Sequence, residues 1–393
     1  MSNTRRPVYL DYQATTPVDP RVMDAMLPFF TEAFGNPHST SHSYGWEARD
    51  AVEQARKQVA TMINADPREV VFTSGATESN NMAIKGVARF YEGRKGHMIV
   101  PVSEHKCVLE SAKYAQKLGY DITWLAVGTD GLIDPAAVKG AIRDDTALVS
   151  VMQVNNEIGV IQPIAEIGAI CREAGVYLHT DAAQAAGKTG IDVAAMNIDL
   201  LSLSGHKMYG PMGIGALYVR RKPRVRLEPL FDGGGQERTL RSGTLPAPLV
   251  VGFGAAAAIV TAERDIEATR IGDLRDLLLK GLQQRILDLY VNGSMEYRVA
   301  GNLNIGFKGI SSEALMDALM DSVALSSGSA CTSAAVEPSY VLRAIGLSDE
   351  DAHASVRLCV GRMTTPDEVE TAIEAIADAV QMLRGGTSVA SVA

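Results

Sequence analysis

Short apolar runs alternate with helix-like stretches between residues 70 and 220. Each run spans four to eight residues without strict alternation of apolar and polar positions, which is typical of strands buried on both faces. The runs lie at 70–73, 98–102, 122–127, 147–154, 176–181, 200–204 and 215–220. Strands that alternate with helices predict a mostly parallel seven-stranded sheet with helices on both sides, which is an α/β fold.

Helical patterns lie on both sides of this region. Apolar residues from Ala48 to Met62 recur at steps of three and four, which marks one face of a helix. Leucines and isoleucines over 271–289 define a long amphipathic helix. A last helix is expected to begin at Thr365, an N-cap residue followed by proline and then by glutamate, and to end at Gly385.

The pattern of the chain changes near residue 263, after which strand and helix signals are mixed. We therefore expect a large domain over 16–262 and a smaller α+β domain over 263–393 that is completed by residues 1–15. The uncharged segment Thr244–Ala262 lies just before this boundary. Because it contains two prolines and many small residues, we interpret it as a loop followed by a packed core helix. A membrane span needs about 20 strongly apolar residues.

The composition is that of a globular protein with a large core. Of the 393 residues, 46% are apolar and 21% are charged, which excludes a disordered or coiled-coil chain. The formal charge of −9 argues against direct binding to nucleic acid. The four cysteines form no CxxC pair, which favours a reducing compartment. The first residues lack the apolar stretch of a signal peptide, so we expect the cytoplasm, or the mitochondrial matrix if a presequence was removed.

Polar residues gather just after the predicted strands, where parallel sheets bind ligands. The segment Thr73–Asn80 follows one strand and precedes a helix, so small residues and helix N–H groups could hold a phosphate there. An ordinary capped turn would look the same. Lys207 and Asp181 follow two further strands. A lysine at the end of a buried strand suits capture of an aldehyde, and an aspartate suits a protonated pyridine nitrogen.

Together these groups are the ones that pyridoxal 5'-phosphate requires. At this point the whole chain resembles the group I cysteine desulfurases of the housekeeping iron–sulfur type, the IscS/NifS family of class V aminotransferase-like enzymes. The matching segments are YLDYQATTPVDPRV, FGNPHSTSHSYGWEA, VVFTSGATESNN, EHKCVL, VNNEIGV, TDAAQ, SGHKMYGP, RVRLEPLFDGGGQERTLRSGT, LSSGSACTSAAVEPSYVLRAIGL and SVRLCVGR. The resemblance implies a fold type I enzyme that depends on pyridoxal phosphate.

The resemblance also implies a role for each matching residue. Lys207 would join the cofactor covalently, Asp181 would support its ring nitrogen, and Gln184 would bond its phenolic oxygen. His105 would stack on the ring and transfer protons, and Thr244 would reach the phosphate of the other subunit of a homodimer. The implied cofactor-binding set is Lys207, Ala76, Thr77, His105, Asn156, Asp181, Gln184, Ser204, His206 and Thr244, and the implied substrate-binding pair is Asn156 and Arg357.

Cys331 separates this family from related enzymes. It lies among small polar residues, SSGSACTS, which favour exposure, on a segment expected to form a mobile loop over about 326–340. Cys171 and Cys359 have apolar surroundings that fit inert, buried thiols. Cys107 follows His105 by two positions, but no further ligand spacing supports a metal site there. By resemblance, Lys207, His105 and Cys331 are catalytic, and Cys331 would also contact an iron–sulfur cluster on a partner transiently.

The implied reaction converts L-cysteine to L-alanine and leaves the sulfur on Cys331 as a persulfide. The sulfur would then pass to an IscU-like scaffold protein for iron–sulfur cluster assembly and to other acceptors, as in tRNA thiolation. Relatives often continue beyond the last helix with a segment that docks the scaffold, whereas this sequence stops soon after Arg384. Two further departures, Met212 and the stretch 299–302, touch no predicted catalytic group.

Other functions fit the same cofactor motifs. A nitrogen-fixation desulfurase is one alternative, and a selenocysteine lyase or an aminotransferase of the same fold is another. The last two do not need a mobile thiol in the way that a desulfurase does. A catalytically silent scaffold for sulfur-transfer partners would lack some of the cofactor groups, and this sequence contains all of them.

Overall fold

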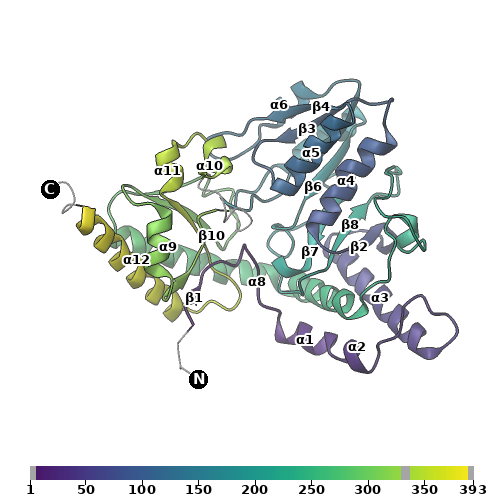
Figure 1. The fold of residues 1–393 in the computed structure, drawn as a ribbon, viewed down its shortest axis with the longest axis horizontal. Helices are drawn as coiled ribbons and strands as arrows, with labels where there is room; N and C mark the ends of the chain where they lie inside the picture. The colour runs from purple at the N-terminus through teal and green to yellow at the C-terminus, as the bar shows by residue number, and fades with distance from the viewer. Residues whose placement is uncertain (1–5, 329–336, 388–393) are drawn as a thin grey trace.

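The central element of the fold is a seven-stranded sheet. The computed structural model describes residues 6–328 and 337–387. The sheet has the order β2-β8-β7-β6-β5-β3-β4 and is parallel except for β8, which runs antiparallel to both neighbours. Every predicted run forms one strand: β2 (Val70–Thr73), β3 (His97–Pro101), β4 (Asp121–Leu125), β5 (Thr146–Ser150), β6 (Tyr177–Asp181), β7 (Leu200–Ser204) and β8 (Gly215–Val219). The predicted mostly parallel α/β fold is therefore confirmed (Figure 1).

Both faces of the sheet are buried because neighbouring residues of a strand point to opposite sides. Val71 packs with residues of α4 (Ala76–Phe90) and α5 (Lys106–Lys117) on one face. Phe72 packs with α3 (Ser43–Met62), α7 (Ile164–Ala174) and the first part of α8 (Ala247–Arg285) on the other. This double burial explains why the strands read as continuous apolar runs.

The shorter helices of the first part connect these layers. They are α1 (Pro20–Met26), α2 (Pro28–Thr31) and α6 (Pro135–Ala141), with 3₁₀ turns at Pro67–Glu69, Gly205–Lys207 and Glu237–Thr239. Each of α1 and α6 begins with an aspartate cap followed by proline, which fixes the start of the helix.

Helix α8 is one continuous helix of 39 residues. The sequence predicted two separate helices here, and the expected domain boundary at residue 263 falls inside α8. The first part packs closely on α3 because Gly254 is small: a Cβ atom there would lie 2.5 Å from the Cβ of Ala55. The second part carries Leu274, Leu278 and Leu282 into a second apolar cluster. The helix therefore connects two cores.

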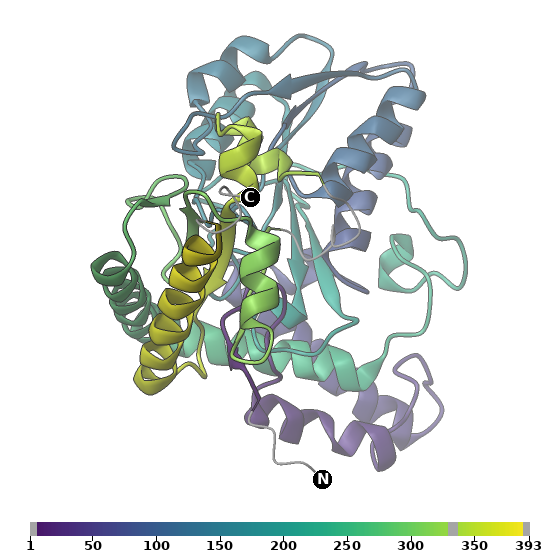
Figure 2. The same cartoon turned by 60° about the vertical axis from the view of Figure 1, so that its left-hand side comes forward.

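The second core contains the remaining elements. Strands β9 (Leu289–Val291), β10 (Asn302–Phe307) and β12 (Ser355–Cys359) form an antiparallel sheet of order β12-β10-β9. Helices α9 (Ser312–Leu319), α10 (Tyr340–Ala344), α11 (Asp349–His353) and α12 (Pro366–Thr387) accompany it, and the yellow α12 lies beside α9 in Figure 2.

The start of the chain joins this second core. Strand β1 (Val8–Tyr9) pairs in parallel with β11 (Val323–Ala324), and Leu10 is buried in the same apolar cluster. These contacts accord with the grouping of residues 1–15 with 263–393, and the division into two domains stays a prediction.

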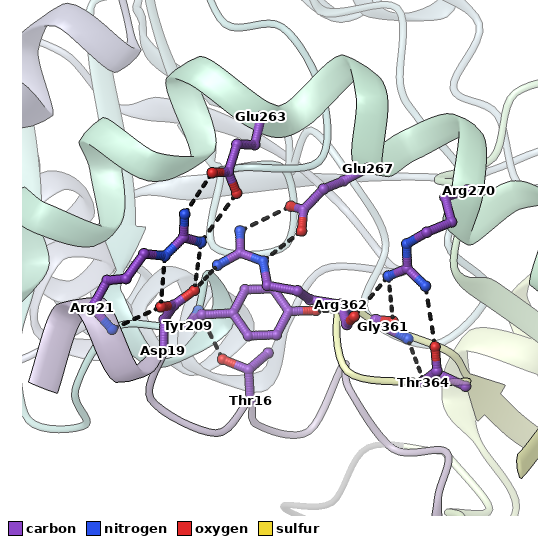
Figure 3. A network of polar contacts seen from close by, with 10 residues as sticks. All are labelled: Thr16, Asp19, Arg21, Tyr209, Glu263, Glu267, Arg270, Gly361, Arg362 and Thr364. Atoms are coloured by element: carbon purple, nitrogen blue, oxygen red, sulfur yellow. Dashed lines mark hydrogen bonds and ion pairs between the residues drawn. The ribbon is translucent and has the colours of Figure 1, made fainter.

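A polar network of buried and half-buried residues lies where the two cores meet (Figure 3). The Arg362 guanidinium pairs with Asp19 (2.7 Å) and with Glu267 of α8 (2.5 Å), and it lies 4.2 Å from the ring centroid of Tyr209. The Tyr209 backbone N–H in turn donates to Thr16 Oγ1 (2.8 Å). Tyr209 has a φ of +64°, a conformation that needs support in a bulky residue. The network thus connects the segment after β12, helix α8 and the N-terminal segment to the residues just after Lys207.

The uncharged segment before residue 263 is a loop followed by a core helix, as predicted, because α8 begins at Ala247. Ala247, Val250, Phe253 and Ala257 are buried in the main apolar cluster. Across residues 6–328 and 337–387, no helix combines the length and the apolar character that crossing a bilayer requires.

Candidate active site

One cavity of about 370 Å³ lies at the carboxyl ends of β2, β5, β6 and β7. Its position follows from the parallel sheet, since the loops that leave those strand ends converge on one edge. Nearly all predicted site residues with described positions line it, although they come from distant parts of the chain. They are Ala76, Thr77, His105, Asn156, Asp181, Gln184, Ser204, His206, Lys207 and Arg357.

Two predicted residues are not in this set. Thr244 is exposed and does not line the cavity of its own chain. Its predicted role concerns the other subunit of a dimer, so it stays a prediction. Cys331 lies outside the described residues.

The start of α4 supplies one end of the cavity. Gly75 occupies the N-cap position with a φ of +151°, and no side chain caps the helix there. The first backbone N–H groups of α4 therefore remain available beside the side chain of Thr77, as anion binding requires. The Glu78 carboxylate accepts the Ser74 N–H (2.7 Å) and pairs with Arg241 (2.8 Å), so its negative charge is partly compensated.

His206 lies at the same edge of the sheet. Its Nδ1 is 3.0 Å from the Thr15 hydroxyl oxygen. Burial, together with the nearby Lys207 and Lys188 ammonium groups, lowers the pKa of His206 to about 4. The ring is therefore neutral at physiological pH and can offer an N–H without bringing a charge.

Lys207 ends the 3₁₀ turn Gly205–Lys207, which follows β7 directly. Its ammonium group donates hydrogen bonds to the backbone carbonyls of Gln13 (2.7 Å) and Ala14 (2.6 Å). The sequence did not identify these partners, because QATTP carries no side-chain signal for a role played by backbone oxygens. The two carbonyls hold the amine at the wall of the cavity.

Asp181 is the last residue of β6 and is buried. One carboxylate oxygen accepts a hydrogen bond from the Asn80 side-chain amide (2.6 Å) and the other accepts the Ala183 N–H (2.9 Å). Asn80 is itself fully buried on α4, one turn beyond Thr77. Its position in the motif TSGATESNN was the signal that could have revealed it. These bonds fix the carboxylate at the cavity.

His105 caps the start of α5. Its Nδ1 accepts the backbone N–H of Cys107 (3.2 Å) and lies 3.0 Å from the Cys107 sulfur. Because Nδ1 is an acceptor here, a neutral ring carries its proton on Nε2. The preceding Glu104 is fully buried, and burial followed by the charge of Asp181 raises the pKa of its carboxyl well above the usual value. Glu104 was not predicted from the sequence.

Arg357 approaches the cavity from β12 of the second core. It is 1% exposed, and its guanidinium donates to the Asn156 carbonyl (2.7 Å) and to Asp11 Oδ1 (2.7 Å). Its Nε and the Asn156 side-chain oxygen are buried without a hydrogen-bond partner in the described part of the chain. Buried polar atoms without partners are costly, so this pair is suited to a polar ligand.

The sequence left open an H-x-C metal pair at His105 and Cys107. Within the described ranges, no three His, Cys, Asp or Glu side chains are placed to hold a metal ion together.

The comparisons with known proteins agree with this geometry. Residues 8–371 match the aminotransferase class-V family model. The cysteine desulfurase IscS of Rickettsia rickettsii is 56% identical over 98% of this chain and 93% of its own. A solved NifS-like protein has a TM-score of 0.89 at 34% identity, covering 96% of this chain and 100% of its own. SspA in complex with cysteine has a TM-score of 0.81 at 40% identity, covering 91% and 99%.

The chain therefore belongs to the aminotransferase class-V family, whose enzymes depend on pyridoxal phosphate. Within that family it belongs to the cysteine desulfurases of the IscS type. The predicted family and cofactor class are thus confirmed.

The residues of the cavity fit pyridoxal phosphate. The uncapped start of α4 suits the phosphate, and Lys207 suits the aldehyde. The buried Asp181 carboxylate suits a protonated ring nitrogen. The unpartnered Arg357 Nε leaves a donor for the carboxylate of an amino acid beside the cofactor. Asn156 Oδ1 is an acceptor, so Asn156 can bond that carboxylate only through its side-chain N–H groups. Which residue plays which role stays a prediction.

Arg357→Lys tests the carboxylate site. Lysine keeps the positive charge beside Asp11 but loses the planar fork that binds two carboxylate oxygens. We expect KM for cysteine to rise roughly 10- to 100-fold, because a charge-assisted hydrogen bond contributes about 1.5–3 kcal/mol. Steady-state kinetics measures the change. Arg343→Lys is the control, since Arg343 pairs with Asp349 at the surface. An unchanged KM in Arg357→Lys would remove Arg357 from the substrate site.

Proposed function

We propose that this protein removes sulfur from L-cysteine, releases L-alanine, and receives the sulfur on Cys331 as a persulfide. The observation that carries the proposal is the convergence of Lys207, Asp181 and Arg357 on one cavity in a chain of the cysteine desulfurase family. Lys207 can bond the aldehyde of the cofactor, Asp181 can pair with its ring nitrogen, and Arg357 can bind the carboxylate of the substrate. Together these groups suit chemistry at the α-carbon of an amino acid.

Each residue of the cavity has a separate role in this reaction. Pyridoxal phosphate, when bound, supplies an electron sink for the α-carbon. Arg357 and Asn156 hold the substrate carboxylate, and Asp181 keeps a proton on the ring nitrogen. Lys207 and His105 move protons to and from the substrate carbons, a role that demands an amine or imidazole within hydrogen-bonding reach.

Sulfur transfer requires a thiolate. The Cys331 thiolate attacks the substrate sulfur, so a sulfur–sulfur bond forms as the carbon–sulfur bond breaks. The electron pair of the broken bond stays on the substrate carbon, which takes up a proton and becomes the methyl group of alanine. An ordinary thiol is mostly protonated at neutral pH, so its proton must leave during turnover.

The protein acts as a homodimer that passes sulfur to acceptors. Thr244 is exposed in the single chain, so it is accessible to a second subunit whose phosphate it is predicted to reach. The similarity to IscS proteins supports an IscU-like scaffold and other sulfur acceptors as partners, with the cytoplasm as the compartment. The mitochondrial matrix is the alternative compartment.

The test is a product assay on the purified holoenzyme. With L-cysteine and a thiol reductant, we expect alanine and sulfide in equal amounts, and no amino group transferred to an added 2-oxo acid. Amino transfer without sulfide would instead identify an aminotransferase. Turnover of L-selenocysteine with no turnover of L-cysteine would identify a selenocysteine lyase. Either result would overturn the proposed function.

A further inference from the structure

A second, smaller cavity lies behind Lys207. It measures about 50 Å³, which leaves room for no more than a few water molecules. Gln13 and Lys207 line both this cavity and the larger one, so they form part of the wall between them. Lys188 lines only the smaller cavity, whereas Gln184 lines only the larger one. The predicted function gives Lys188 no role.

Lys188 forms a hydrogen bond with Gln184, which lines the larger cavity. The two are four residues apart in the turn region that follows β6, and the Lys188 ammonium donates to Gln184 Oε1 at 2.9 Å. The other end of the carboxamide, Nε2, donates to the Gln13 carbonyl at 2.9 Å. That same carbonyl accepts the Lys207 ammonium at 2.7 Å. Lys188, Gln184, Gln13 and Lys207 therefore form one hydrogen-bonded chain.

This chain determines which way the Gln184 carboxamide faces. An ammonium group only donates hydrogen bonds, so the atom facing protonated Lys188 must be the oxygen. The nitrogen must then face the other way, and its second N–H remains for a ligand in the larger cavity. The Gln13 carbonyl only accepts, so it favours the same orientation from the other side. Without Lys188 one of these two restraints is lost, and the carboxamide can more readily present its oxygen to the predicted phenolic oxygen of the cofactor, where an acceptor would face an acceptor.

We propose that Lys188 is a positioning residue, which rests on the proposed function: it orients Gln184 toward the cofactor and places a second positive charge behind Lys207. The charges around it support this assignment. Glu267 on α8 forms an ion pair with Arg362, so it does not neutralise the charge of Lys188. Arg264 on the same helix is paired with Asp265.

The remaining titratable groups that face the cavity are Lys207, Tyr12, Tyr209 and Cys359, and Arg357 and His206 are close enough to interact. Burial first, and then the charge of Lys207, lower the pKa of Lys188 to about 7. When both amines are protonated, their like charges repel each other. By reciprocity, the Lys188 charge disfavours a proton on the Lys207 nitrogen.

The sign of the effect follows from both actions of Lys188. Removing its charge makes a proton on the Lys207 nitrogen easier to hold, which raises the pH at which that proton is lost. A less firmly oriented Gln184 donor leaves the phenolic oxygen more basic, which strengthens its attraction for the same proton and acts in the same direction.

The experiment is a pH titration of the visible absorbance of the holoenzyme without substrate. In Lys188→Met we expect the midpoint to rise by roughly one pH unit, the size of shift that a nearby like charge produces. Lys188→Arg keeps the donors and stays charged at every pH of the titration, so its midpoint should not rise above that of the wild type. If Lys188→Met does not fold, the neutral Lys188→Gln is expected to shift the midpoint in the same direction. Arg264→Met is the matched control, because it removes a cation that lines the same cavity but is paired with Asp265.

The outcomes separate the two proposals. A normal spectrum with an unchanged midpoint in Lys188→Met, or an equal rise in Arg264→Met, would overturn the role of Lys188 alone. A lower melting temperature with no shift of the midpoint would show a purely structural role and would overturn it as well. A wild-type protein without visible cofactor absorbance would overturn the proposed function, and this inference with it.

Discussion

Lys207→Ala is expected to lose the covalent attachment of the cofactor and at least about 10³-fold in turnover of cysteine, as is typical when an acid–base catalyst is removed. Lys207 is the amine that the carbonyls of Gln13 and Ala14 hold at the cavity. Alanine has no group that can bond the aldehyde or carry a proton. The remaining phosphate and ring contacts would still bind the cofactor, but only reversibly.

Borohydride reduction followed by peptide mass spectrometry measures the attachment directly. The wild type should carry the reduced cofactor on the peptide that contains Lys207, and the variant should carry none. Lys113→Ala is a suitable control, because Lys113 is an exposed lysine paired with Glu110. Label on another lysine of the wild type, or full activity in Lys207→Ala, would refute the assignment.

The sequence predicted the strands and the cavity well because their signals are local. A strand buried on both faces must be continuously apolar, so each of the seven runs marked its strand to within a few residues. The residues after those strands then had to meet at one edge of the sheet, whatever the details of the loops. The placement of Asp181 and Lys207 in one cavity needed no knowledge of any long-range contact.

Features that depend on distant partners could not be predicted in this way. Arg362 is one arginine among many until its contacts with Asp19 and Glu267 are known. The carbonyl of Gln13 acts on Lys207 through the backbone, which leaves no trace in residue type. Helix α8 looked like two elements because its two parts pack in different cores, so their apolar positions do not follow one common face.

Cys331→Ala is expected to abolish persulfide formation and to lower alanine production by at least about 10³-fold, because the nucleophile for sulfur is lost. The other thiols are poor substitutes. Burial raises the pKa of Cys171 to about 12 and that of Cys359 to about 11, so both stay protonated at neutral pH. Both are also nearly inaccessible, with exposed fractions of 0% and 1%.

Cys107 is the rival that the experiment must exclude, since it lines the same cavity as Lys207. Its sulfur lies 3.0 Å from Nδ1 of His105 and accepts a hydrogen bond from the Asn80 side-chain amide at 3.1 Å. Cys107→Ala is therefore the matched control. After a single turnover with L-cysteine, mass spectrometry should find the added sulfur on Cys331 in the wild type and in Cys107→Ala. Added sulfur on Cys107, or undiminished alanine production by Cys331→Ala, would show that the reaction does not use Cys331.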